Sequence, residues 1–365
     1  MGVFDAIGSE THEEVLFGVD HRSGLRTIIA IHNTALGPAL GGTRFFPYPS
    51  EEEALEDVLR LAKGMTYKSA AAGLDLGGGK AVIIGDPATD KSERLFRVYG
   101  SAIDSLGGRY ITAEDVGTTM EDMVMIRRAT DYVSGLPLAH GGSGDPSPAT
   151  ARGVQRAMEA VAERMWGSSG LSGRRIAVQG VGKVGMGLVE RLREAGVETI
   201  VADVNPAAVD HAVTVFVAKG VELDEIYGVD SDIFSPCALG ATINERTIPL
   251  LQTAAIVGSA NNQLGIDEDA DRLDERGILY APDFVVNAGG VINIATERDG
   301  YSVERAAEMV DRIFDNVGTV LDLAAAEGIN TNQAAQRIAE ERIEAVGTLA
   351  MKRPSRSNNG GRPWR

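Results

Sequence analysis

Apolar and polar residues alternate along the chain with two different periods, which predicts a mixture of strands and helices. In the first 150 residues, the strand pattern falls at 14–19, 26–31, 80–85 and 109–113. Helical spacing of apolar positions falls at 51–63 and 92–106. Ser50 and Glu53 form a capping pair before the first helix, and Gly64 is expected to end it.

From about residue 147 the pattern becomes a regular succession of strands and helices. Ser147 and Pro148 fit the start of a helix that runs to about 165. Another helix is expected at 183–195, and strands at 175–179, 199–203, 232–234, 255–258, 278–281 and 284–287. This alternation predicts a parallel, doubly wound sheet of the Rossmann type. Two helical runs, 303–327 and 332–350, end the pattern.

Length and composition predict a two-domain globular protein. The chain has 365 residues, of which 44% are hydrophobic. A Gly-, Ser- and Pro-rich stretch at 141–148 marks a joint, so we expect one domain over 1–146 and another over 147–330. The tail 352–365 carries basic but no acidic residues and is expected to be disordered.

Charge and cysteine content narrow the classes of partner. The net charge of −17 disfavours binding to nucleic acid or to an anionic membrane surface. No apolar run reaches about 18 residues, and the N-terminus lacks the pattern of a signal peptide. The single cysteine, Cys237, suits a reducing compartment, so we expect a cytoplasmic protein. Without a Cys/His cluster, no metal site is expected.

Lysines are rare in this chain, and three of them cluster. Of the 35 Lys and Arg residues only 7 are Lys, yet Lys63, Lys68 and Lys80 lie within 18 residues. Their neighbours are small and apolar, and three glycines precede Lys80, so a ligand could approach the backbone closely. A desolvated lysine, unlike an arginine, can be tuned toward neutrality and serve as a base. The simpler interpretation is that Lys68 and Lys80 are solvated and flank a flexible loop.

A glycine-rich turn between a predicted strand and a predicted helix indicates a dinucleotide site. Its residues are Gly180, Val181, Gly182, Lys183, Val184 and Gly185. In such a turn the glycines allow a tight bend, close approach of the pyrophosphate and close helix packing. The helix N-terminus favours the phosphate charge. By itself this pattern is weak in a chain with 44 glycines.

An acidic residue at the end of the next strand strengthens the dinucleotide interpretation. Asp203 stands 18 residues after Gly185, where a carboxylate accepts hydrogen bonds from the adenosine ribose and repels a 2′-phosphate. No arginine follows at 204–206, so NAD is expected rather than NADP. The alternative is an aspartate that only caps a turn.

These motifs resemble the amino-acid dehydrogenases that act on glutamate, leucine, valine and phenylalanine. Besides the lysine segment and the glycine turn, the resemblance rests on the runs 41–44, 113–117, 259–263 and 287–291. It covers roughly residues 10 to 350 and is strongest toward the valine and leucine enzymes. It implies an N-terminal α/β substrate domain, a Rossmann NAD domain, a last helix (331–351) that returns to the first domain, and a homo-oligomer.

The resemblance implies a role for each candidate residue. Lys80 would be the general base that activates water, Asp115 would exchange protons with the substrate nitrogen, and Lys68 would bind the carboxylate. Backbone near Gly41 and Met65 would complete the carboxylate site, and Asn262 would help to position the substrate. The cofactor would contact the glycine turn, Asp203 and a further group: Thr150, Cys237, Ala238 and Asn261. Arg44 and Glu114 are expected to be structural.

Residues that the resemblance assigns to the side-chain pocket are apolar: Leu40, Ala113, Val291 and Ile294. Because a buried unpaired charge costs several kcal/mol, a dicarboxylic substrate is not expected. Ile294 favours a short branched side chain over an aromatic ring. The implied activity is therefore reversible, NAD-dependent oxidative deamination of valine, leucine and isoleucine. Without the resemblance these four residues are ordinary core.

Three alternatives stay open. The pocket could suit phenylalanine. A 2-hydroxy-acid dehydrogenase would need a histidine paired with an acid, and of the five histidines only His140, near the joint, is a candidate. A non-catalytic NAD-binding sensor would need the glycines and Asp203 but not Lys68, Lys80 and Asp115 together.

Overall fold

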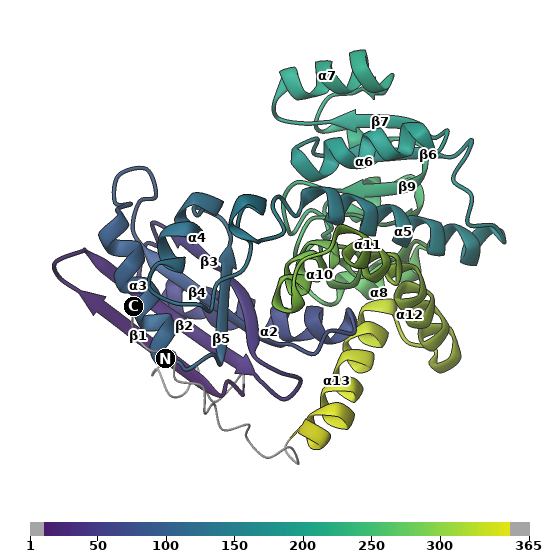
Figure 1. Ribbon diagram of the computed structural model, residues 1–365. Helices are drawn as coiled ribbons and strands as arrows, with labels where there is room; N and C mark the ends of the chain where they lie inside the picture. The colour runs from purple at the N-terminus through teal and green to yellow at the C-terminus, as the bar shows by residue number, and fades with distance from the viewer. Residues whose placement is uncertain (1–10, 351–365) are drawn as a thin grey trace.

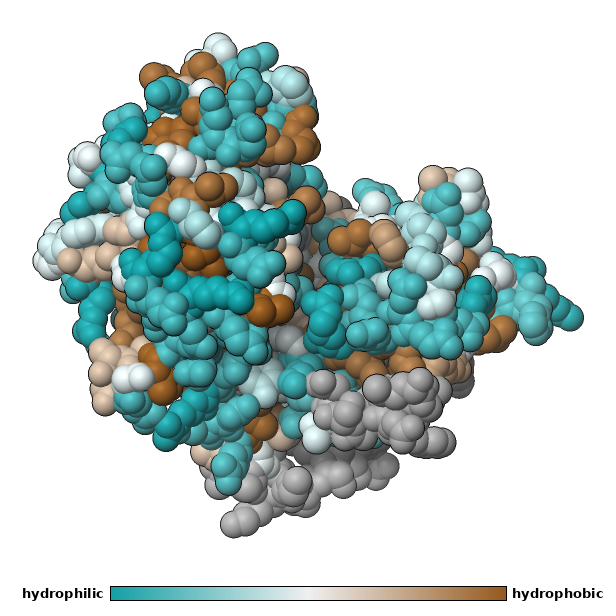
Figure 2. All heavy atoms as spheres, turned by 180° about the vertical axis from the view of Figure 1, so that it is seen from behind, coloured by the Kyte–Doolittle hydropathy of each residue, from teal (hydrophilic) through white to brown (hydrophobic). Residues whose placement is uncertain are grey.

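Two lobes, each built on its own sheet, form the molecule (Figure 1). This is a computed structural model, and it describes residues 11–350, except the side chains of Asp299 and of residues 348–350. Seen from behind, the surface is hollowed between the two lobes, and apolar residues are scattered among polar ones (Figure 2). The mixed α/β class expected from the sequence is confirmed.

The first lobe contains a five-stranded mixed sheet in the order β1-β2-β4-β3-β5. Strands β1 and β2 are antiparallel, as are β2 and β4, whereas β3 runs parallel to both β4 and β5. The strands are β1 (Glu14–Asp20), β2 (Leu25–Asn33), β3 (Ala39–Phe46), β4 (Gly77–Ile84) and β5 (Tyr110–Glu114). The helices of this lobe are α2 (Glu51–Ala71), α3 (Glu93–Ser105) and α4 (Met120–Arg127).

Alternating side chains of β2 bury both faces of this sheet. Ile28 and Ala30 pack with α2, through residues such as Val58. Ile29 and Ile31 point to the opposite face and belong to the core that contains α3 and α4. Successive strand residues face opposite sides, so a strand buried on both sides is apolar at nearly every position.

Helix α2 is longer than the sequence pattern predicts. Ser50 caps it as expected, its side chain accepting a hydrogen bond from the Glu53 N–H at 3.1 Å. Gly64, the expected end, lies inside the helix, which continues to Ala71. A Cβ at Gly64 would meet nothing within 4 Å, so no feature of the fold requires glycine there. The extra turns carry Met65 and Lys68 toward the second lobe.

The second lobe contains six parallel strands in the order β11-β10-β9-β6-β7-β8. Their bounds are β6 (Arg175–Gln179), β7 (Glu198–Ala202), β8 (Lys219–Gly220), β9 (Ser231–Pro236), β10 (Thr253–Ile256) and β11 (Leu279–Tyr280). The strand order reverses between β6 and β9. Ligands of doubly wound sheets bind at this switch point, outside the carboxyl ends of the strands.

Helices cover both faces of the second sheet and connect it to the first lobe (Figure 1). They are α5 (Ser147–Trp166), α6 (Lys183–Glu194), α7 (Pro206–Phe216), α8 (Asp269–Glu275), α9 (Asp283–Val286), α10 (Gly289–Ala295), α11 (Val303–Asp311), α12 (Ile313–Glu327) and α13 (Thr331–Ala350). Short 3-10 turns occur at Leu138–His140, Glu225–Gly228, Ile248–Leu250 and Thr296–Asp299. Helix α13 packs against both α12 and α2.

Three expectations for this region are wrong. The apolar run at 284–287 forms the short helix α9 rather than a strand. The run at 303–327 is two helices, α11 and α12, that meet at Arg312. Ser147 is the first residue of α5 rather than its cap, and the Asp145 carboxylate accepts its N–H at 2.9 Å.

Within residues 11–350, no helix has the length and apolar character needed to cross a membrane. The expected disordered tail and the N-terminal residues without a signal pattern lie outside the described residues.

Candidate active site

A cavity of about 350 Å³ lies between the two lobes and is lined by all of the predicted catalytic and substrate residues. The first lobe contributes Leu40, Gly41, Met65, Lys68, Lys80, Ala113 and Asp115. The second contributes Thr150, Val184, Asn261, Asn262, Val291 and Ile294. These residues come from segments far apart in the chain, so the fold alone brings them together.

Lys80 and Asp115 form an ion pair in the wall of this cavity. Lys80 lies on β4 and is 6% exposed, and Asp115 directly follows β5. Their Nζ and Oδ2 atoms are 2.9 Å apart. Burial raises the pKa of Asp115, but the charges of Lys80 and Arg44 outweigh it, so the pKa ends below its usual value.

Lys68, in the last turn of α2, contacts the second lobe directly. Its Nζ donates to Oδ1 of Asn261 at 2.9 Å. Burial lowers the pKa of Lys68 to about 8, with the Asp283 charge opposing this effect and the Lys80 charge adding to it.

The three glycines before Lys80 serve the packing of the protein rather than ligand access. A Cβ at Gly78 would overlap Thr66 of α2, and a Cβ at Gly77 would overlap the carbonyl of Asn33. The same crowding holds on β3, where a Cβ at Gly41 would overlap the carbonyl of Gly79. The expectation that a ligand approaches the backbone at 77–79 is therefore wrong, because helix and strands already fill that space.

The apolar end of the cavity combines both lobes. Leu40 lies on β3 and Ala113 on β5, while Val291 and Ile294 lie on α10. Leu40, Ala113 and Val291 are 3%, 4% and 8% exposed, and Ile294 is half-buried. No charged side chain stands among these four, so this end suits an apolar group.

The glycine-rich turn has the form expected of a dinucleotide site. It follows β6 and precedes α6, with Gly180 at φ +96° and Gly182 as the helix cap. A Cβ at Gly185 would overlap the carbonyl of Gly180, so the third glycine permits close packing. No side chain caps α6, and a Cβ at Gly182 would meet nothing within 4 Å. The first N–H groups of α6 are thus left for an anion.

Asp203 directly follows β7 and faces this turn. Its Oδ2 accepts the N–H of Val181 at 2.7 Å, and its Oδ1 accepts that of Asn205 at 2.8 Å. Asp203 therefore does cap the local turns. Each carboxylate oxygen has a second lone pair, so capping is compatible with binding of ribose hydroxyls.

The other predicted cofactor residues surround the same crevice. Thr150 lies in the first turn of α5 and donates to the carbonyl of Pro146 at 3.1 Å. Cys237 follows β9 and is half-buried, and Ala238 packs directly against Gly180. Lys183 is mostly exposed, with its Nζ 3.5 Å from Asp145.

Three polar residues in or beside the site were missed or judged structural from sequence. Arg44 contacts Asp115, with Nε 3.2 Å from Oδ2. Asp283, at the start of α9, lines the cavity, and burial raises its pKa. Asn287 donates to Oδ1 of Asn261 at 2.9 Å, beside Lys68. The run 287–291 of the family resemblance carries the signal for Asn287, whereas Asp283 directly precedes the run 284–287 that the apolar pattern assigns to a strand.

Among residues 11–350, no histidine lines this cavity. His140 lies in an exposed turn, and His12 and His32 pack edge to face in the first lobe at 4.9 Å between ring centroids. The arrangement required of a 2-hydroxy-acid dehydrogenase is therefore not found.

A parallel sheet with a glycine-rich turn, facing a cleft that carries two lysines and an aspartate, is typical of an α/β oxidoreductase. Comparison with known proteins agrees. Residues 11–132 match the family described as Glu/Leu/Phe/Val dehydrogenase, dimerisation domain. Residues 141–229 and 207–350 match the Glutamate/Leucine/Phenylalanine/Valine dehydrogenase family. The chain belongs to this family and is an amino-acid dehydrogenase.

Individual relatives cover nearly the whole chain. The leucine dehydrogenase of Geobacillus stearothermophilus is 56% identical over 346 residues, which is 95% of this chain and 94% of the relative. The phenylalanine dehydrogenase of Lysinibacillus sphaericus is 47% identical over 99% of this chain and 94% of its own. The crystal structure of L-tryptophan dehydrogenase from Nostoc punctiforme superposes with a TM-score of 0.84 at 44% identity, covering 94% of this chain and 99% of that one.

Proposed function

We propose that the protein catalyses the reversible, NAD-dependent oxidative deamination of branched-chain L-amino acids. The observation that carries this proposal is the joining of Lys68, Lys80 and Asp115 in one cavity that has an apolar end. An α-amino acid presents the matching groups: a carboxylate for Lys68, a nitrogen for Asp115 and a side chain for the apolar end. Identity to leucine dehydrogenases supports the same substrate class.

Each polar residue has one task in this reaction. Lys68 pairs with the substrate carboxylate, assisted by backbone near Gly41 and Met65. When bound, NAD supplies the acceptor for the hydride that leaves the substrate Cα. Lys80 takes a proton from the water that attacks the resulting imino carbon, and Asp115 exchanges protons with the departing nitrogen. Asn261 and Asn262, which belong to the second lobe, orient the nicotinamide ribose and the substrate.

NAD is proposed as the cofactor because the crevice fits it. Uncapped N–H groups at the start of α6 suit the pyrophosphate, and Asp203 suits the ribose hydroxyls. Residues Val204 and Asn205, which follow Asp203, carry no positive charge for a 2′-phosphate. The contacts proposed for Thr150, Cys237 and Ala238 lie along the same crevice.

Domain division and assembly are also proposals. Residues 1–146 with 331–351 would form the substrate unit, and residues 147–330 the NAD unit. The packing of α13 on α2 supports this division, with Tyr67 donating to Glu340 at 2.9 Å. A homo-oligomer is supported by the matched dimerisation domain and by exposed Phe17 and Val19 on the edge strand β1.

Specificity for aromatic amino acids is the second candidate, since phenylalanine and tryptophan dehydrogenases are close relatives. The half-buried Ile294 on α10 favours aliphatic substrates. A change of one methylene discriminates by only about 1–3 kcal/mol, so several aliphatic amino acids should be accepted.

The test is NADH formation with L-leucine, L-valine, L-isoleucine, L-phenylalanine, L-tryptophan, L-glutamate and L-lactate. Turnover that is highest on the three branched-chain substrates supports the proposal. Preference for the aromatic substrates would replace it with the second candidate. Binding of NAD without turnover on any substrate would indicate a sensor.

A further inference from the structure

Arg44 connects the reacting centre to a second cavity on the first lobe. Its Nε donates to Oδ2 of Asp115 at 3.2 Å, and its Nη1 donates to Oδ2 of Asp57 at 2.8 Å. Lys80 contacts the same Oδ2 of Asp115. The Oδ2 atom of Asp115 therefore contacts two cations, those of Lys80 and Arg44. The Arg44 guanidinium in turn contacts two carboxylates, those of Asp115 and Asp57.

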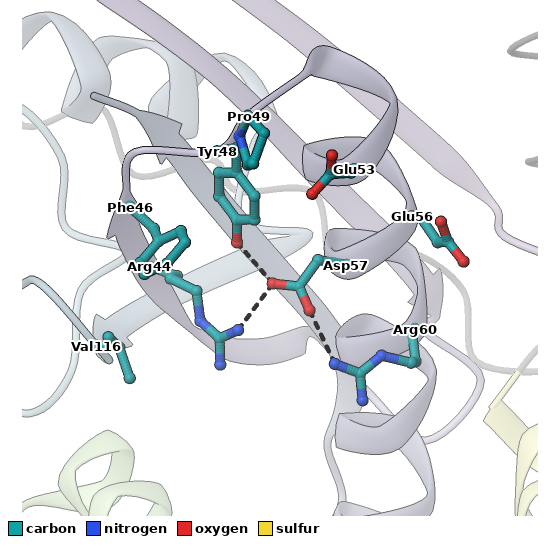
Figure 3. Close-up of a pocket in the computed structure, with 9 residues that line it drawn as sticks. All are labelled: Arg44, Phe46, Tyr48, Pro49, Glu53, Glu56, Asp57, Arg60 and Val116. Atoms are coloured by element: carbon teal, nitrogen blue, oxygen red, sulfur yellow. Dashed lines mark hydrogen bonds and ion pairs between the residues drawn. The ribbon is translucent and has the colours of Figure 1, made fainter. Parts of the chain in front are cut away.

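Asp57 is itself held on several sides. Tyr48 donates to its Oδ2 at 2.6 Å, and Arg60 donates to its Oδ1 at 2.8 Å. Figure 3 shows these side chains converging from α2 and from the end of β3, in the wall of a cavity of about 480 Å³. Burial raises the pKa of Tyr48, so its hydroxyl stays a donor. The Arg44 guanidinium is thus held by Asp57, which is itself held by Tyr48 and Arg60.

The two cations beside Asp115 differ in one chemical respect. A lysine that acts as a base must be neutral for part of each catalytic cycle, whereas arginine keeps its charge throughout. During that part of the cycle Arg44 is the permanent positive charge in contact with Asp115. A buried carboxylate without a cation tends to take up a proton.

We propose that Arg44 is a positioning residue that acts through Asp115, keeping this carboxylate ionised and oriented while Lys80 is neutral. Asp57 and Tyr48 hold Arg44 in place for this task. The inference rests on the proposed function, because it assumes that Lys80 and Asp115 work as base and proton carrier. The alternative is that Arg44 has only a structural role, in which its ion pair with Asp57 links β3 to α2.

The test compares Arg44→Gln, which removes the charge, with Arg44→Lys, which keeps it. We expect Arg44→Gln to lower kcat on the best amino acid at least tenfold and to move the acid limb of kcat upward by about one pH unit or more. The sign follows because Asp115 loses a cation that favours its ionised form. In Arg44→Lys the acid limb should stay near that of the wild type. Arg26→Met, which removes an exposed arginine paired with Glu51, is the charge control.

A double-mutant cycle with Asp115→Asn separates action of Arg44 through Asp115 from a purely structural role of Arg44. If Arg44 acts through Asp115, adding Arg44→Gln to Asp115→Asn lowers kcat no further. Equal fold losses in both backgrounds, or an unmoved acid limb in Arg44→Gln, would overturn the proposal. Should Arg44→Gln fail to fold, the same cycle with Arg44→Met, which also removes the charge, decides. A wild-type enzyme without amino-acid turnover refutes the proposed function instead, before any variant is compared.

Discussion

Lys80 and Asp115 meet across the strand that separates their own strands. Lys80 lies on β4 and Asp115 follows β5, and β3 runs between these strands in the sheet. At the crossing β3 carries Gly42, which has no side chain to displace Asp115. A Cβ at Gly42 would lie 2.5 Å from the carbonyl oxygen of Glu114 and 2.8 Å from the Cβ of Asp115. Glycine on β3 is therefore a condition for the ion pair.

Gly42→Ala should damage activity through Asp115. The new methyl group would displace the Glu114 carbonyl and, with it, Asp115. A shift of about 1 Å near a reacting centre can cost 100-fold in rate. We expect kcat to fall roughly 10- to 100-fold, measured by NADH formation. Gly318→Ala on α12, where a Cβ meets nothing within 4 Å, is the matched control and should keep full activity. An active Gly42→Ala enzyme would argue that the position of Asp115 is unimportant.

Carboxylate binding should weaken as pH rises through about 8. The pKa of Lys68 is lowered to about 8, so the free site holds an ammonium below this pH and loses its charge above it. We expect the Kd of 4-methylpentanoate, which has no amine, to rise about tenfold per pH unit above that point. Calorimetry from pH 6 to 10 measures this dependence, and Lys68→Met should remove it.

Asp283→Asn should move this transition to lower pH. The Asp283 charge supports the Lys68 ammonium, so its removal lets burial lower the pKa further. Asn retains an oxygen that can accept the Gln263 N–H, now 2.9 Å from Oδ2 of Asp283. The pH dependence of the Kd of 4-methylpentanoate, measured by calorimetry, tests this. An unchanged midpoint would contradict the stabilisation of the Lys68 ammonium by Asp283.

Asp203→Asn should reduce the preference for NAD over NADP. The amide keeps an acceptor for the Val181 N–H but loses the charge that repels a 2′-phosphate. Hydrogen bonds to charged groups contribute about 1.5–3 kcal/mol, so we expect the KM for NAD to rise roughly tenfold or more. The ratio of kcat/KM for the two cofactors measures the effect. A ratio equal to that of the wild type would indicate that Asp203 only caps the turn.

Local patterns predicted the second sheet well because its strands are short apolar runs between clear turns. The strand expected at 175–179 is β6, with both bounds as predicted. Short apolar runs elsewhere were ambiguous, since four residues such as 284–287 are too few to separate strand from helix by period. Gly64 misled because glycine often ends a helix, yet the buried face of α2 continues through Ser69 and Ala70.

The site was predictable to the extent that its residues belong to sequence motifs. The sequence motifs identify Lys68, Lys80 and Asp115, and the structure brings all three into one cavity. The contacts of Arg44 with Asp115 and Asp57 could not be predicted from the sequence. Arg44 and Asp57 lie 13 positions apart on different elements, and only the packing of α2 against the first sheet brings them together.

Exposed apolar side chains on β1 should mark a contact between subunits. Phe17 and Val19 are 52% and 67% exposed on an edge strand. We expect Phe17→Asp to lower the mass of the assembly in sedimentation experiments, because a buried carboxylate at an interface is costly. Val303→Asp, at an exposed apolar position on α11, should leave the mass unchanged. Loss of assembly only in the second variant would place the interface elsewhere.

We infer that amino acids are oxidised at the cavity that holds Lys68, Lys80 and Asp115. Its most direct test is NADH formation by Lys80→Ala with L-leucine, beside the wild type. Removing a general base typically costs about 100- to 10,000-fold, so we predict a loss in this range with NAD binding intact. A Lys80→Ala variant that oxidises L-leucine at the wild-type rate would show that the reaction does not use Lys80 as its base.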